Sequence, residues 1–200
     1  MTDEQQGSEV TEYYANGNVK AQGYMQNGKL QGTCRAYSED GLLMAEYLFA
    51  DDLLNGVTVE YYPSGVVFAK TEYVDDQKHG WRQTFYENGQ VKSEMQFKND
   101  TPDGECREYY EDGQLKSECQ YSGGLLYGVA KLYYSDGTLQ QESVFYQGKR
   151  NGTCKEYFEN GRLMMACDFT DDKRNGTFYG YDSTGQLLET REYINGQEKK

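Results

Sequence analysis

The sequence predicts an all-β protein, an array of eight 24-residue β-hairpin repeats that form one elongated, twisted antiparallel sheet. Three observations predict this fold: a glycine that recurs at a fixed step, two turn signals in every repeat, and the lack of a helical period. The glycine stands every 24 residues, at Gly17, Gly41, Gly65, Gly89, Gly113, Gly137, Gly161 and Gly185. Self-similarity at a fixed period is typical of repeat architectures, in which each unit packs mainly on its neighbours.

Other positions keep the same step around each glycine. In the repeat centred on Gly113, an aromatic residue stands four positions earlier (Tyr109), an aliphatic residue two positions later (Leu115) and a bulky apolar residue eight positions later (Tyr121). A second glycine series also has a step of 24, at Gly32, Gly56, Gly80, Gly104, Gly128, Gly152 and Gly176. No insertion breaks the register, so chance does not account for the pattern.

Two turn signals divide each repeat into two strands. Asp112-Gly113 predicts a two-residue type I′ hairpin turn, because both central positions of that turn need a positive φ. A second turn signal follows ten residues later in most copies, for example at Asp75-Asp76. The segments between turns are about five to seven residues long, the usual length of a strand. No segment combines a 3.6-residue period with helix caps, so no helix is predicted.

A two-residue turn at Asp112-Gly113 fixes which residues face each other. The predicted pairs are Glu111 with Gln114, Tyr110 with Leu115, Tyr109 with Lys116, Glu108 with Ser117, and Cys106 with Cys119. Because side chains alternate along a strand, one face is expected to be mainly apolar and the other polar. The first face carries Cys106, Glu108, Tyr110, Leu115, Ser117, Cys119 and Tyr121, and the second carries Tyr109, Gln114, Lys116, Glu118 and Gln120.

The predicted organisation is one repeat array between two short tails. We expect a polar N-terminal tail over residues 1–10, the array over residues 11–196 with its eighth copy truncated, and a C-terminal tail over residues 197–200. No long apolar run appears in the sequence, and the N-terminus has no apolar signal core. A cytoplasmic location is therefore expected unless a separate export route exists.

The charge balance narrows the class of partner. The chain has 20 Lys and Arg against 33 Asp and Glu, for a net charge of −13. Nucleic acids and anionic membrane surfaces attract basic proteins, so neither is an expected partner. The charge favours a basic protein partner, or it serves only solubility.

Four of the five cysteines are predicted to face each other in pairs. Cys106 is expected opposite Cys119, and Cys154 is expected opposite Cys167. An odd count excludes a fully paired disulfide framework, and a reducing cytosol favours free thiols. Oxidation is expected to close both pairs and leave Cys34 free. The sequence has no CxxC motif that would indicate a zinc ribbon.

Catalytic and metal-binding residues are not predicted. The one histidine, His79, stands just before a glycine of the second series and is expected in a turn, so no Ser–His–Asp triad or His-rich metal site is available. The pairs Asp51-Asp52 and Asp75-Asp76 occupy turn positions. Calcium ligation and an acidic edge facing a basic partner are alternatives for them. We therefore expect no cofactor, no metal and no enzymatic activity.

Aromatic residues are the remaining contact candidates. A ladder on the apolar face consists of Tyr62, Tyr86, Tyr110, Tyr134 and Phe158, which either contact a partner or pack in the core. Trp81 on the polar face is a candidate anchor for a partner, and packing on Tyr61 or Phe85 is its alternative.

The phrase "EYYEDGQLKSECQY" at residues 108–121 resembles the MORN-repeat superfamily. The similarity is strongest to the bacterial variant found in YwqK-family antitoxins. Matching residues extend from about Tyr13 to Gly196, whereas Ser38 and Asp182 depart from the pattern by replacing the second aromatic residue. The resemblance implies stacked β-hairpins, a protein-binding role and neutralisation of a partner toxin.

The predicted function is therefore that of a non-catalytic antitoxin or immunity protein that binds a basic toxin. A structural scaffold that self-associates through its terminal edge strands is the first alternative. A carbohydrate or lipid-headgroup binder that uses aromatic platforms is the second.

Overall fold

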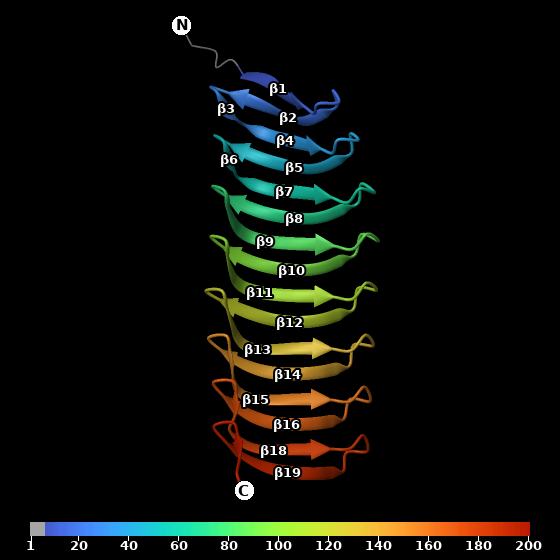
Figure 1. The fold of residues 1–200 in the computed structure, drawn as a ribbon, viewed down its shortest axis with the longest axis vertical. Helices are drawn as coiled ribbons and strands as arrows, with labels where there is room; N and C mark the ends of the chain where they lie inside the picture. The colour runs from blue at the N-terminus through green and yellow to red at the C-terminus, as the bar shows by residue number, and fades with distance from the viewer. Residues whose placement is uncertain (1–6) are drawn as a thin grey trace. The chain divides into compact units, whose positions relative to one another are not determined.

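The computed structural model describes residues 7–200, and every regular element in that range is a β-strand (Figure 1). Eight antiparallel hairpins follow one another in chain order, which confirms the predicted all-β repeat fold. No element of the described range is a helix that could span a membrane. The chain divides between Thr101 and Pro102 into two compact units.

The first unit contains ten strands. They are β1 (Gly7–Tyr13), β2 (Val19–Gln26), β3 (Lys29–Leu30), β4 (Gly32–Tyr37), β5 (Leu43–Ala50), β6 (Leu53–Leu54), β7 (Gly56–Tyr61), β8 (Val67–Val74), β9 (Gln77–Phe85) and β10 (Val91–Lys98). Strand β1 starts at Gly7, so residues 7–10 of the predicted tail are part of a strand. Residues 1–6 of that tail lie outside the described residues.

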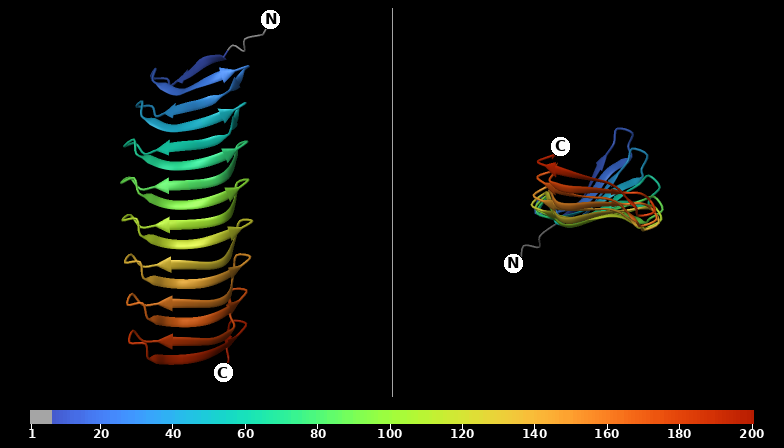
Figure 2. Two further views of the ribbon diagram at one scale, coloured as in Figure 1. Left: turned by 180° about the vertical axis from the view of Figure 1, so that it is seen from behind. Right: turned by 90° about the horizontal axis from the view of Figure 1, so that it is seen from below.

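The second unit contains the other ten. They are β11 (Thr101–Tyr109), β12 (Leu115–Ser122), β13 (Leu125–Tyr133), β14 (Leu139–Tyr146), β15 (Lys149–Tyr157), β16 (Leu163–Thr170), β17 (Lys173–Arg174), β18 (Gly176–Tyr181), β19 (Leu187–Ile194) and β20 (Gln197–Glu198). The short strand β20 occupies the start of the predicted C-terminal tail. Figure 2 shows that the long strands are bowed along their length.

The first turn of each repeat is built differently from the prediction. At Asp112-Gly113 only the glycine has a positive φ, of 88°. The Gly113 N–H donates to the Tyr110 carbonyl (2.9 Å), and the Tyr110 N–H donates to the Gln114 carbonyl (2.8 Å). This is a three-residue loop, a type I turn closed by a glycine in the left-handed region. The predicted type I′ turn at this position is wrong.

The paired positive φ values occur at the other turn instead. Asp75 and Asp76 have φ values of 48° and 66°, and Asn27-Gly28 has 54° and 77°. Asn and Asp tolerate this region better than other side chains because they form local hydrogen bonds. At the first turn, the Asp112 side chain closes the loop, because its Oδ1 accepts from the Gln114 N–H at 3.0 Å.

The longer loop changes the register next to the turn. Tyr109 pairs with Leu115, where Lys116 was predicted, and a bulge then restores the predicted pairs Glu108–Ser117 and Cys106–Cys119. The bulge also turns Lys116 toward the face of Glu108, with 3.5 Å between Nζ and Oε2. Lys116 is therefore not on the polar face, and Glu108 has an ion-pair partner.

The core lies on the face that was predicted to be apolar, called here the inner face and defined by Cys106, Ser117, Cys119 and their equivalents. The buried side chains of the described range lie on it: Ala45, Thr58, Ala69, Thr71, Thr84, Cys106, Ser143, Cys154, Cys167, Phe169 and Tyr193. Most are small, because a single curved layer cannot enclose large side chains at its centre. The opposite, outer face carries Glu118, Gln120 and their equivalents.

Candidate functional site

The tyrosines of the predicted ladder hold successive repeats together. Tyr62 Oη donates to the Phe85 carbonyl (2.8 Å), and Tyr110 Oη donates to the Tyr133 carbonyl (2.7 Å). Tyr134 Oη donates in the same way to the carbonyl of the next repeat, at 2.8 Å. These hydroxyl groups are thus used within the array, and only the half-buried rings remain for a partner. Partner contact by the ladder stays a prediction.

Tyr86 also makes a ring contact, and Phe158 lacks the hydroxyl group. The Tyr86 ring lies under the ammonium group of Lys92, 5.5 Å from the ring centroid, in a cation–π contact. Phe158 has no hydroxyl and makes no such inter-repeat bond. Trp81 belongs to the outer face and is half-buried, and its backbone N–H donates to Glu72 Oε2 at 3.0 Å. A partner contact at these aromatic residues stays a prediction.

The aspartate pairs are turn residues that also join neighbouring repeats. Asp52 Oδ1 accepts from the Leu30 N–H (2.6 Å), while the Asp52 N–H donates to the Leu30 carbonyl (3.1 Å). The first aspartates contact side chains of the preceding repeat: the Asp51 N–H donates to Gln31 Oε1 (2.9 Å), and Asp75 Oδ1 accepts from Asn55 (3.2 Å).

The histidine is not a turn residue, contrary to the prediction. His79 occupies the same place in its repeat as Asn55, and it lies within strand β9. Its Nδ1 is 3.1 Å from Asn99 Oδ1. His79 therefore contacts the following turn from a strand. Asn55 makes the equivalent contact to Asp75 from the residue between β6 and β7.

The described residues contain no cluster of metal ligands. Among residues 7–200 no three His, Cys, Asp or Glu side chains come together as ligands for a metal ion. The carboxylates of Asp52 and Asp76 instead bind backbone amides. The role of the aspartate pairs as an acidic edge toward a basic partner stays a prediction.

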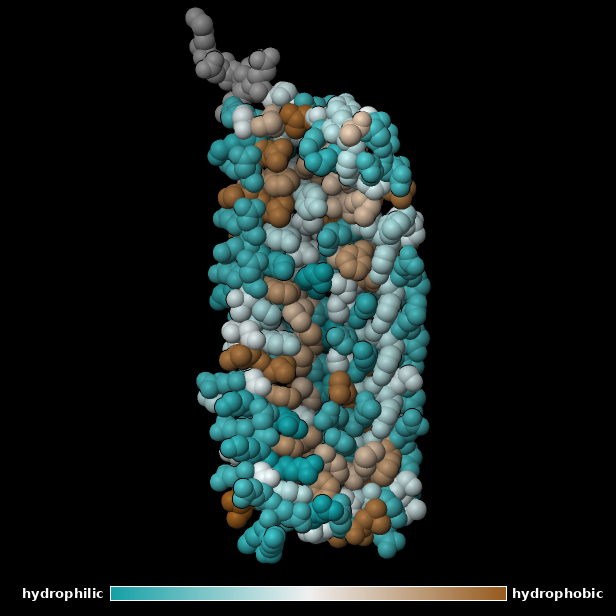
Figure 3. Space-filling view, in the orientation of Figure 1, coloured by the Kyte–Doolittle hydropathy of each residue, from teal (hydrophilic) through white to brown (hydrophobic). Residues whose placement is uncertain are grey.

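A groove on the inner face of the second unit was not found by sequence reasoning. Two adjoining pockets of about 250 and 590 Å³ share Glu156 and Met164. We call their combined lining the C-terminal groove: Leu132, Tyr134, Gln140, Gln141, Glu156, Tyr157, Met164, Met165, Arg174, Phe178, Gly180, Tyr181, Leu188 and Glu189. Figure 3 shows brown apolar side chains bordered by teal polar ones over the C-terminal strands.

The groove arises from substitutions within the repeat. Met164-Met165 stands where another copy has Lys116-Ser117, and Leu132 stands where that copy has Glu108. Gly180 also occupies the Glu108 position, and a Cβ there would lie 3.0 Å from Glu189 Cγ. Leu132 and Met164 thus replace charged side chains with apolar ones, and Gly180 removes a side chain from the groove lining. The sequence signal was therefore present, as apolar residues at positions that are charged or polar elsewhere.

The outer face carries small charge networks. Glu118 Oε1 accepts from Tyr133 Oη (2.8 Å) and from Lys131 Nζ (3.1 Å). The Tyr133 hydrogen bond, together with Lys131, holds the pKa of Glu118 below its usual range. In the first unit, Tyr61 and Arg35 lower the pKa of Glu46 in the same way. Each network fixes one carboxylate beside a cation and a tyrosine hydroxyl on the outer face.

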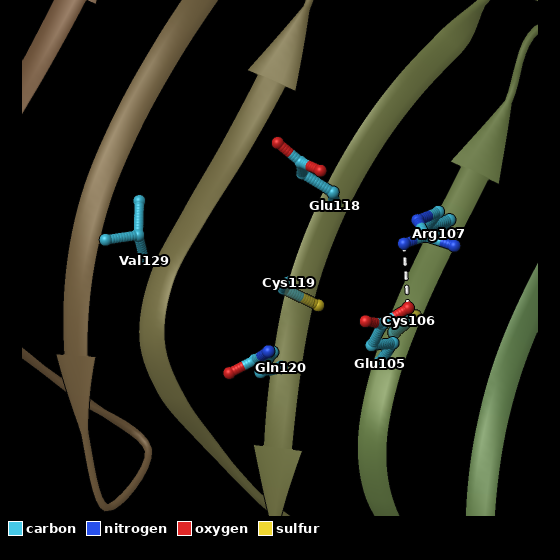
Figure 4. Close-up of a pocket in the computed structure, with 7 residues that line it drawn as sticks. All are labelled: Glu105, Cys106, Arg107, Glu118, Cys119, Gln120 and Val129. Carbon is cyan, nitrogen blue, oxygen red and sulfur yellow. Dashed lines mark ion pairs between the residues drawn. The ribbon is translucent and has the colours of Figure 1, made fainter.

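The cysteine pairs face each other across two hairpins. Cys106 lies opposite Cys119 in β11–β12, and Cys154 lies opposite Cys167 in β15–β16. All five cysteines are free thiols. Figure 4 shows Cys106 and Cys119 beside a pocket of about 320 Å³, with the Glu105–Arg107 ion pair next to them.

The repeat segments match a known protein family. The family described as MORN repeat variant matches residues 7–27, 54–75, 78–99, 102–122, 126–147, 150–171 and 174–195. The chain belongs to this family. The matched segments of this MORN repeat variant protein cover seven of the eight hairpins, and the hairpin that contains Ser38 is the unmatched one. The repeat is thus that of an interaction module.

Solved structures add only remote likenesses. The crystal structure of TcdB2-TccC3-Cdc42 is 14% identical over 94% of this chain, with a TM-score of 0.19, and that of TcdB2-TccC3 is 14% identical over 92%, with a TM-score of 0.20. The Tc holotoxin pore of Photorhabdus luminescens is 14% identical over 96%, with a TM-score of 0.20. This MORN repeat variant chain spans 13–14% of the length of those chains. No curated protein matches the chain.

Proposed function

We propose that this MORN repeat variant protein is a non-catalytic antitoxin or immunity protein that binds and neutralises a basic partner toxin in the cytoplasm. The C-terminal groove is the observation that carries the proposal. Leu132, Met164 and Leu188 contribute apolar side chains to its lining, which also includes the acidic residues Glu156 and Glu189 and the basic residue Arg174. A partner segment with apolar anchors and basic flanks is complementary to that surface.

Charge supports the choice of partner. The net charge of −13 steers a basic protein toward this surface and speeds association at low salt. The exposed side chain of Leu188, at 66%, gives the partner an apolar anchor point that water now contacts. Burial of such anchors provides affinity, while the surrounding carboxylates favour the correct partner over acidic ones.

The experiment first captures a partner and then tests whether a substitution in the C-terminal groove abolishes binding. Tagged protein is purified from its host at low and high salt, the captured protein is produced separately, and its binding and toxicity are measured. We expect one basic protein whose capture weakens as salt rises and whose growth inhibition is relieved by co-expression. Leu188→Asp should abolish binding and relief.

Leu125→Asp is the matched control, because Leu125 is also an exposed leucine of the second unit, at 50%, but lies outside the groove. It should leave binding intact. Equal loss in both variants, or a captured protein that does not inhibit growth, would overturn the proposal.

A self-associating scaffold is the second candidate. Strand β19 exposes Leu187 (50%), Leu188 (66%) and Ile194 (55%), and apolar edge strands favour pairing with another copy. Sedimentation velocity over a hundredfold concentration range distinguishes the two functions. Species that grow with concentration, and that disappear in Leu188→Asp, support the scaffold.

A further inference from the structure

The two facing cysteine pairs have the same place in their hairpins but different surroundings. Directly opposed residues of an antiparallel pair have Cα atoms about 4.5–5.5 Å apart, within the range that disulfides span. Cys106 with Cys119 and Cys154 with Cys167 are both directly opposed. Geometry along the hairpin therefore permits a bond in either pair, and access decides which pair reacts.

The two pairs differ in one side chain of the following repeat. Phe178 packs against the cluster of Cys154, Cys167 and Phe169, and both thiols of this pair are only 1% exposed. The residue equivalent to Phe178, two repeats earlier, is Ala130. Its single methyl group does not cover the first pair. Cys119 is accordingly only half-buried, although Cys106 is buried at 8% exposure.

The hydrogen bonds of the two cysteine pairs also differ. The side chains of Cys106 and Cys119 hydrogen-bond each other. This bond and burial raise the pKa of Cys106, and the bond lowers the pKa of Cys119. In the second pair, Cys154 Sγ accepts from Ser143 Oγ (3.1 Å) and from Gln141 Nε2 (3.6 Å). Burial raises the pKa of Cys167. The attacking form of a cysteine is an accessible thiolate. Cys119 is the most exposed of the four thiols, so it is the best placed nucleophile.

We propose that Cys106 and Cys119 form a peroxide-reactive thiol pair, in which Cys119 attacks and Cys106 resolves, whereas Cys154 and Cys167 remain thiols. The Cys119 thiolate attacks one peroxide oxygen, an S–O bond forms, the O–O bond breaks, and water leaves after protonation. Cys106 sulfur then displaces hydroxide from the sulfenic acid of Cys119, and its proton completes a second water. Two thiols and one hydrogen peroxide give one disulfide and two waters, with two electrons passing from sulfur to peroxide.

The product ties β11 to β12 within a single hairpin. A thiol reductant reverses it by exchange. The pair lies outside the C-terminal groove, so its oxidation state and partner binding are separable properties.

The first experiment measures which thiols react. The folded protein is treated with limiting hydrogen peroxide, remaining thiols are blocked with N-ethylmaleimide, and peptides are mapped by mass spectrometry. We expect loss of two thiols, a Cys106–Cys119 disulfide, and full labelling of Cys154 and Cys167 after denaturation. Cys34 is the matched single thiol, because it is also half-buried but faces Tyr47. Reaction of Cys154–Cys167 at an equal rate, or of Cys34 before Cys119, would overturn the proposal.

Cysteine variants test the separate roles of Cys119 and Cys106. Variants at Ala130 and Phe178 test whether the covering side chain sets the rate of oxidation. In Cys106→Ser, a sulfenic acid that dimedone traps should accumulate at Cys119, and Cys119→Ser should trap nothing at Cys106. Ala130→Phe should slow the first pair to the rate of the second, and Phe178→Ala should expose the second pair. Because Phe178→Ala also opens a cavity, the Ala130→Phe variant decides the test by itself. An unchanged oxidation rate of the first pair in folded Ala130→Phe would refute control by this side chain.

Discussion

Asp76 is bonded to Leu54 of the preceding repeat through two hydrogen bonds. Its carboxylate accepts from the Leu54 N–H at 2.7 Å, and its own N–H donates to the Leu54 carbonyl at 2.9 Å. The turn residue thus imitates a strand residue, satisfying both backbone groups of its partner. Asp52 and Asp172 repeat the arrangement. Where glycine takes this position, as in Gly124, only the backbone bond remains.

Removal of the Asp76 carboxylate should loosen the joint between two repeats. Asp76→Ala loses the acceptor and places alanine at a φ of 66°. We expect a cost of about 1–2 kcal/mol from both effects. Asp76→Asn retains an oxygen acceptor and is the control. Hydrogen exchange of the Leu54 amide should accelerate in the alanine variant only. Equal exchange rates of this amide in both variants would refute a stabilising hydrogen bond from Leu54 to the Asp76 carboxylate.

We expect the free energy of unfolding to fall when a ladder hydroxyl is removed and to rise when one is added. Tyr110→Phe removes the bond to the Tyr133 carbonyl, and we expect a cost of about 1 kcal/mol in urea unfolding. Phe158→Tyr places a hydroxyl where the ladder is interrupted, within reach of the equivalent carbonyl of Tyr181. That variant should be stabilised by a similar amount. A destabilised Phe158→Tyr would show that the seventh repeat does not share the geometry.

The second glycine series should be intolerant where a neighbouring side chain fills the space. Gly56 has a φ of 118°, and a Cβ there would lie 2.5 Å from Leu48 Cδ2. We expect Gly56→Ala to cost about 1–3 kcal/mol from backbone strain and overlap. Gly128→Ala, with Gln120 Oε1 at 3.9 Å as its nearest contact, should cost less. In Leu48→Ala, the added cost of Gly56→Ala should fall; no change would contradict the overlap.

Acid should weaken the second unit through Glu118. The Tyr133 hydroxyl and Lys131 depress the pKa of this carboxylate in the folded state. Its contribution to stability is therefore present above the unfolded pKa, about 4.3, and is lost as pH falls through the folded value. NMR titration should show the pKa of Glu118 rising toward its ordinary value in Tyr133→Phe. An unmoved pKa in that variant would refute the assignment of the shift to Tyr133.

Local patterns were sufficient for much of the fold. The step of 24, the turn positions, the apolar face and the opposed cysteines all follow from spacing along the chain. The type of each turn did not, because Asp-Gly is compatible with both a type I′ turn and a three-residue loop. The bulge that moves Lys116 to the inner face follows from that choice.

The repeat, its strands and its two faces could be predicted from the sequence, because alternation and turn chemistry act between residues close in the chain. The side-chain contacts between neighbouring hairpins could not, because they depend on how the hairpins stack. The tertiary structure brings Met164 and Leu188 into one groove, directs the Tyr110 hydroxyl to a backbone carbonyl, and covers Cys154 with Phe178 while Ala130 leaves Cys119 open. Those contacts join residues 11 to 24 positions apart, where stacking geometry decides the packing and local propensity does not.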